Sequence, residues 1–159
     1  MNFIAILVAA LIPTITGFIW YNPKVFGTAW QKASGVTDEQ MKGANMGIIF
    51  GVSLVLSILL ASMMYPITIH QSGLNSLFVG DESAEGQAQL AALMEQLGGK
   101  YRTFKHGAFH GALAGLFFAL PILGTNALFE RKGFKYIAIN VGYWTLTLAL
   151  MGGLVCGWV

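Results

Sequence analysis

Three histidines are the residues of this chain whose type and spacing come closest to a chemical site. His106 and His110 are four residues apart, so their side chains lie on one face of any helix that contains them. His70 ends an earlier apolar segment, which we expect to reach the same side of a membrane. Three imidazoles near one membrane surface suit zinc, copper or a haem iron. One interpretation of the histidines is therefore a metal or haem site.

Two other interpretations of these histidines stay open. An ionisable group inside a membrane is a functional candidate, so one of them is a proton-responsive role. The other is that the histidines meet water or lipid headgroups at the interface. The pair lacks the acidic residue of a metalloprotease helix, and no carboxylate lies within the apolar segments. Because the sequence also shows no nucleophile–base pair and no glycine-rich phosphate loop, we predict no catalytic residue, no enzyme activity and no resident cofactor.

The composition indicates a membrane protein. Apolar residues make up 55% of the chain and charged residues only 10%, whereas a soluble domain carries about 25% charged residues. So much apolar surface must face lipid. The net charge of +2 forms no basic stripe, which argues against a nucleic-acid partner. The only cysteine, Cys156, excludes an intrachain disulfide.

The elements that must position the histidines are four long apolar segments. A helix needs roughly 20 residues to cross the hydrocarbon, and only helices satisfy their own backbone groups there. We therefore predict an all-α fold, with residues 1–159 forming a single transmembrane domain of four helices. The predicted spans cover about residues 3–21, 46–69, 106–128 and 136–158. Pro13 and Pro121 are expected to bend the first and third spans.

The first loop predicts a short amphipathic helix on the membrane surface. Asn22-Pro23 is typical of a helix start, with Asn as the N-cap and Pro in the first helical position. Trp30 would anchor this helix in the interface. Thr37 and Gln40 match a capping box, which we expect to begin a helix continuous with the second span.

The second loop predicts another surface helix, over Ser83–Leu97. Its apolar stripe would rest on the bilayer or on the bundle, or would dock a partner protein. Gly98-Gly99 would end it. The stripe consists of Leu90, Leu93, Met94 and Leu97.

The distribution of basic residues predicts an orientation in the cell membrane. Four spans put both termini and the second loop on one side, and the first and third loops on the other. The first and third loops are the more basic, which places them in the cytoplasm and both termini outside. The basic residues are Lys24, Lys32, Lys42, Arg131, Lys132 and Lys135 against Lys100, Arg102 and Lys105.

Small residues at four-residue spacing predict close helix packing, within the bundle or between copies of the chain. The rows are Gly43, Gly47 and Gly51 in the second span, Gly107, Gly111 and Gly115 in the third, and Gly153 and Gly157 in the fourth. Trp20, Trp30 and Trp158 are expected to anchor the helices at the membrane interfaces.

Several mixed polar and aromatic runs resemble a known family. The runs are Trp20-Tyr21-Asn22-Pro23, Phe26-Gly27 with Trp30, Thr125-Asn126-Ala127-Leu128-Phe129-Glu130, and Ile139-Asn140-Val141-Gly142-Tyr143-Trp144 with Gly152. They are similar to domain-of-unknown-function family 1761, small membrane proteins of bacteria and fungi, over nearly the whole chain. The resemblance implies a four-span membrane protein and no particular activity.

The sequence leaves three functional hypotheses. The first is a non-enzymatic component that contacts membrane lipids and either self-associates or serves as an accessory subunit of another membrane protein. The second is a small oligomeric transporter or channel lined by Thr14, Thr16, Ser53, Ser57, Thr145 and Thr147. The third is a haem or metal protein that uses His70, His106 and His110.

Overall fold

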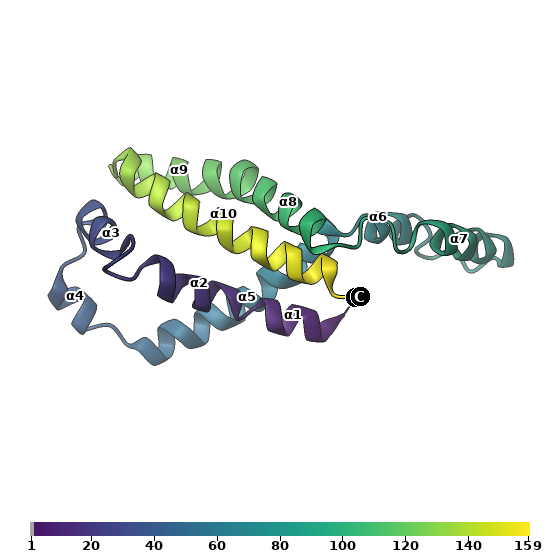
Figure 1. The fold of residues 1–159 in the computed structure, drawn as a ribbon, viewed down its shortest axis with the longest axis horizontal. Coiled ribbons are helices and arrows are strands. Elements are labelled where there is room, and N and C mark those ends of the chain that lie inside the picture. Colours follow the sequence, from purple (N-terminus) through teal and green to yellow (C-terminus); the bar gives the residue numbers. More distant parts are fainter. Residues whose placement is uncertain (1) are drawn as a thin grey trace.

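The computed structural model describes residues 2–159, and every regular element in that range is a helix (Figure 1). Four helical stretches are long and apolar enough to cross a membrane, which confirms the predicted all-α, four-span fold. The first span comprises α1 (Phe3–Ala9) and α2 (Ile12–Trp20), and the second is α5 (Met46–Thr68). The third comprises α8 (Phe104–Ala114), a π-helical turn (Gly115–Ala119) and α9 (Leu120–Phe129), and the fourth is α10 (Phe134–Gly157).

The fourth span lies at the centre of the bundle. α10 packs against α8, α5, α1 and α2, and its most extensive contact is with α8 (Figure 1). The main core lies around the C-terminal half of α10, where Met64, Met151 and Cys156 are almost completely buried. By contrast, every residue from Met46 to Leu56 of α5 is exposed. α5 therefore joins the bundle through its second half and diverges from it in its first.

The contact between α8 and α10 is a contact of backbones. A Cβ atom at Gly107 would overlap the carbonyl oxygen of Gly152, and one at Gly111 would overlap that of Leu148. At Gly115 a Cβ atom would lie 2.5 Å from the Cα atom of Thr145. None of the three positions on the third span has room for a side chain, so the helices approach as closely as the backbone allows.

The other two glycine rows have different surroundings. Cβ atoms at Gly153 and Gly157 would each lie 2.7 Å from an atom of Phe104, so these glycines seat the start of α8. A Cβ atom at Gly51 would meet nothing within 4 Å, and one at Gly47 would touch only the nearby Asn45 side chain. Gly43 is near only carbonyl oxygens of its own helical turn. The row on the second span thus has no partner helix within the described chain.

Both predicted proline positions coincide with irregular helix geometry. α1 ends at Ala9, and α2 begins at Ile12, one residue before Pro13. The carbonyl of Pro13 accepts a hydrogen bond of 2.7 Å from the Tyr143 hydroxyl. A π-helical turn ends two residues before Pro121, as expected where a proline removes an intrahelical hydrogen bond. A further proline, Pro66, lies inside α5 and was not predicted to bend the second span.

The first loop corrects two predicted boundaries. Its surface helix, α3 (Gly27–Ser34), does not begin at Pro23, because the side chain of Asn22 accepts the Lys24 amide and the preceding residues form a turn. The capping box of Thr37 and Gln40 is present, but its helix, α4 (Asp38–Lys42), is not continuous with the second span. Gly43 weakens the helix there, and Asn45 caps α5 anew by accepting the Ile48 amide.

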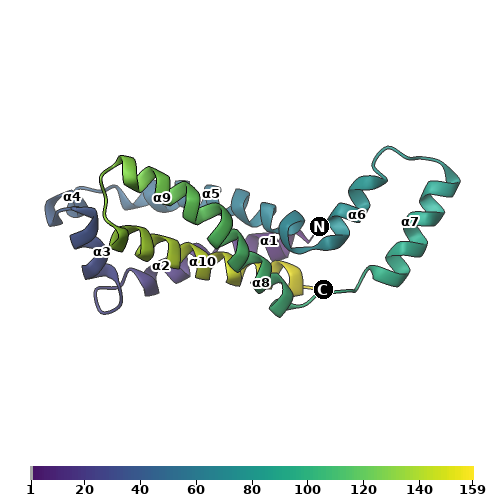
Figure 2. The same cartoon turned by 90° about the horizontal axis from the view of Figure 1, so that it is seen from above.

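The second loop forms a helical hairpin. Its second helix, α7 (Ala84–Leu97), agrees with the prediction and is capped by Ser83. Its first, α6 (His70–Leu77), was not predicted. The Gln71 amide joins the two by donating to the carbonyls of Leu97 (2.6 Å) and Lys100 (2.9 Å). The hairpin projects past the end of the bundle where both termini lie, while α3 and α4 lie at the opposite end (Figures 1 and 2).

Candidate metal centre

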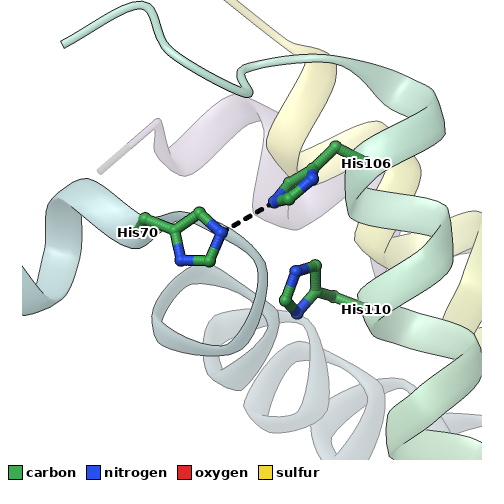
Figure 3. A group of neighbouring side chains, drawn as sticks. All are labelled: His70, His106 and His110. Carbon is green, nitrogen blue, oxygen red and sulfur yellow. Dashed lines mark hydrogen bonds between the residues drawn. The ribbon is translucent and has the colours of Figure 1, made fainter. Parts of the chain in front are cut away.

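The fold brings the three histidines together, as Figure 3 shows. His70 is the first residue of α6, whereas His106 and His110 lie one turn apart on α8. The Nε2 atoms of His70 and His106 are 2.9 Å apart and share a hydrogen bond (Figure 3). One nitrogen from each of the three rings lies within 4.8 Å of the others. The cluster therefore joins two segments that are 36 residues apart in sequence.

A break between two helices places His70. Ile69 has an extended conformation, with φ −111° and ψ 102°, so α5 ends at Thr68 and a new helix begins with His70. The Ile69 amide still donates to the Tyr65 carbonyl, which keeps the break tight. Gln71 then fixes the new helix to the end of α7 through its two hydrogen bonds. The helix that begins with His70 is therefore fixed both to the end of α5 and to the end of α7.

The start of α8 is also fixed by hydrogen bonds and by backbone contacts. Arg102 donates to the carbonyls of Cys156 (2.9 Å) and Trp158 (3.1 Å), which ties this segment to the end of α10. The hydroxyl of Thr103 accepts the His106 amide and so caps α8. One residue further on, Gly107 lies against the backbone of α10. His106 and His110 therefore project from a helix whose position is determined by backbone contacts.

Aromatic rings surround the cluster on one side. The ring of Tyr101 stacks on His106 with centroids 5.1 Å apart and meets His70 edge-on at 5.8 Å. Tyr101 has a left-handed backbone conformation, φ 63°, that turns the chain sharply before α8. Lys100 lies 5.4 Å above the Tyr101 ring. His70 is exposed and the two histidines of α8 are half-buried, so the cluster is accessible from solvent.

The arrangement suits a metal ion better than a haem. In the His70–His106 hydrogen bond one Nε2 carries a proton and the other accepts it, and a metal ion can replace such a proton. Three neutral imidazoles are a common ligand set for zinc and copper, with a further position left for water. A porphyrin does not fit between two ring nitrogens that are 2.9 Å apart. Among the described residues the cluster contains imidazoles alone, without a carboxylate.

The hydroxyls considered as a channel lining are not gathered around one pore. Those of Thr16 and Thr147 bond to each other at 2.8 Å inside the bundle. The Thr145 hydroxyl is buried against Gly115 without a partner among residues 2–159. The remaining three, on Thr14, Ser53 and Ser57, line a cavity between α2, α5 and α10.

The tryptophans considered as interface anchors have three different environments. Trp20 donates from its indole nitrogen to the Ile139 carbonyl (3.0 Å), so it also joins α2 to α10. Trp30 packs edge-on against Tyr21. Trp158 is 38% exposed at the end of α10.

Two residues that shape the centre, Gln71 and Tyr101, were missed by sequence reasoning. Neither belongs to a recognisable motif. Gln71 follows His70 directly, and Tyr101 lies in the segment before α8. Their contacts depend on the pairing of α6 with α7, and no local pattern signals this pairing. The sequence provides only one weak clue, the turn residues Gly98-Gly99 just before Tyr101.

The helices and the cluster define a class: a small α-helical protein with four helices suited to crossing a membrane and three clustered histidines at one end. A family model described as "Protein of unknown function (DUF1761)" matches residues 4–156, and the chain belongs to this family. The predicted family is thus confirmed. No curated protein and no solved structure matches the chain.

Proposed function

We propose that this protein binds a divalent transition-metal ion, zinc or copper, through His70, His106 and His110. The observation that carries the proposal is that nitrogens of all three rings lie within 4.8 Å of one another, although the rings come from two separate helices. The hydrogen bonds of Gln71 hold α6 in place, and those of Arg102 together with the contact of α8 with α10 hold α8 in place. The basic-residue bias of the loops favours a position of this centre on the outer face of the cell membrane.

Metal titration of the purified protein tests this proposal. The protein carries an affinity tag without histidine, is stripped with a chelator, and is titrated with Zn²⁺ or Cu²⁺ against a chromophoric competitor. We expect one ion per chain, and a loss of affinity of about a hundredfold or more in His106→Ala, since one of three ligands is gone. Phe117→Ala is the matched control, because Phe117 is exposed on the same span and lies seven residues beyond His110. Equal metal affinity in His106→Ala and in the control variant would contradict the proposal.

We further propose that the protein self-associates through the first half of α5. Two observations favour this: each of residues 46–56 is exposed, and the row Gly43, Gly47 and Gly51 meets no other helix of the described chain. Small residues at this spacing let two helices of different copies approach closely in lipid. Under the accessory-subunit hypothesis, another membrane protein binds to the same face of α5.

Native mass spectrometry after gentle extraction tests self-association. We expect a homo-oligomer that Gly51→Leu converts to monomer, because a Cβ atom at this position meets nothing within 4 Å and the added side chain would obstruct a neighbouring copy. Ala138→Leu, which adds similar bulk to an exposed position of α10, is expected to leave the oligomer intact. A monomer in the unsubstituted protein contradicts self-association, and extra mass from another polypeptide would favour an accessory subunit.

A further inference from the structure

A cavity lies between the first, second and fourth spans, away from the histidines. Its volume is about 610 Å³, within the range of small-molecule sites. The wall is formed by α2 and the following turn, by α5 from Ile49 to Leu60, and by Tyr143 and Trp144 of α10. It exists because α5 diverges from α2 toward α4 (Figure 1).

The lining excludes a charged ligand. None of the described residues around the cavity carries a charge, so an ionic ligand would lie unpaired in a low-dielectric site. Most of the wall is apolar or aromatic. Phe18 of α2 and Phe50 of α5 both line it, with ring centroids 5.6 Å apart. A ligand must therefore be neutral and largely apolar, and these aromatic side chains favour a flat ring.

The serine hydroxyls that line the cavity favour a ligand with one polar group. Ser57 lines the cavity and is only 5% exposed, and its hydroxyl makes no hydrogen bond within residues 2–159 but remains accessible from the cavity. Ser53, one turn away on α5, also lines the cavity, but it is exposed. Ser62 and Thr68 of the same helix, in contrast, donate to the carbonyls four residues earlier. An unpartnered hydroxyl that faces a largely apolar cavity favours a ligand with a hydrogen-bonding group beside Ser57.

The depth of Ser57 narrows the class of ligand. It is the middle residue of α5, which spans Met46–Thr68, and so lies about 16 Å from either end of the helix. The ester groups of a phospholipid lie outside a hydrocarbon core that is about 30 Å thick, so they do not reach it. A lipid tail would reach Ser57 but offers no hydrogen-bonding group.

We propose that this cavity binds a neutral lipophilic molecule with a ring that accepts hydrogen bonds, of the chemical class of long-chain quinones. The carbonyl oxygen of the ring accepts from Ser57, the ring packs among Phe18, Phe50 and Trp144, and the chain extends into the bilayer. The inference is independent of the metal centre.

Quenching of tryptophan fluorescence tests this inference, because Trp144 lines the cavity. The full-length protein in phosphatidylcholine nanodiscs is titrated with a benzoquinone that carries a ten-carbon chain. We expect saturable quenching that corresponds to one quinone per chain. Ser57→Ala should weaken binding about fivefold to tenfold, because it removes one hydrogen bond. Ser57→Leu, which also fills the cavity, should abolish the saturable part.

Two controls make the experiment decisive. Ser62→Ala lies on the same helix but outside the cavity, and it should bind the quinone as the unsubstituted protein does. Circular dichroism checks that each variant is folded. Quenching that rises linearly and equally in all variants would overturn the proposal. So would displacement of the quinone by a ten-carbon alcohol as effective as displacement by a second quinone, because the ring would then not be recognised.

Discussion

Replacing Gly111 with alanine is expected to destabilise the folded protein by about 1 to 3 kcal/mol, the usual cost of overpacking a tight core. The new Cβ atom would overlap the Leu148 carbonyl oxygen and lie 2.6 Å from its carbon and 2.9 Å from the Cα atom of Ala149. All three are backbone atoms of α10, so no side chain can rotate away. The two helices must separate, and the contact of α8 with α10 is the largest in the bundle. Thermal unfolding followed by circular dichroism measures the loss.

The same substitution at Gly124 is the matched control. Gly124 lies on the same span, but its Cβ atom would be 3.9 Å from its nearest neighbours, side-chain atoms of Leu120 and Ile137. Alanine there fills ordinary van der Waals space and is a better helix former than glycine, so stability should be unchanged or slightly higher. If Gly111→Ala and Gly124→Ala unfold at the same temperature, the backbone contact between α8 and α10 does not hold the bundle together.

Metal binding is expected to weaken about a hundredfold when the pH falls from about 7.5 to about 5.5. An imidazole must be neutral to bind a metal ion, so protons compete at each of the three ligands. The direction follows from this competition: acid weakens binding and neutral pH restores it. His70 and His106 already share one proton in their hydrogen bond, and a metal ion bound to both rings would replace that proton. Titration against a chromophoric chelator at each pH, corrected for protonation of the chelator, provides the measurement.

His110→Ala is the informative comparison for this pH dependence. With two ligands left, fewer protons compete, so its affinity should fall less steeply with pH than that of the unsubstituted protein. A pH-independent affinity in the unsubstituted protein would mean that the bound ion is not held by imidazoles. Parallel slopes in both proteins would mean that His110 is not a ligand, and would leave at most His70 and His106 in the centre.

Some features of the fold were readable because they depend on local pattern. The four spans follow from long uncharged apolar segments, since lipid admits only helices there. The capping box of Thr37 and Gln40 is an interaction within one turn, and it is present. The shared face of His106 and His110 follows from helical periodicity alone. Nothing in these inferences requires knowledge of which helix lies beside which.

Other features depend on contacts through space. The glycine row of the third span meets α10, while the similar row of the second span meets nothing in the chain, and both rows have the same spacing in sequence. The cavity beside Ser57 exists because α5 diverges from α2, a feature that hydropathy does not encode. In the same way, Thr16 and Thr147 satisfy each other across the bundle while neighbouring hydroxyls stay unpaired.

The family, the all-α class and the approximate limits of the four spans could all be predicted from the sequence, because hydropathy and short motifs are properties of single segments. The meeting of His70 with His106 and His110 could not be predicted in this way. That meeting requires a helix break at Ile69, an anchor through Gln71 to the end of α7, and the backbone contact of Gly107 with α10. Each of these is a contact between residues far apart in the chain, and the free energy of such contacts depends on the packed bundle as a whole.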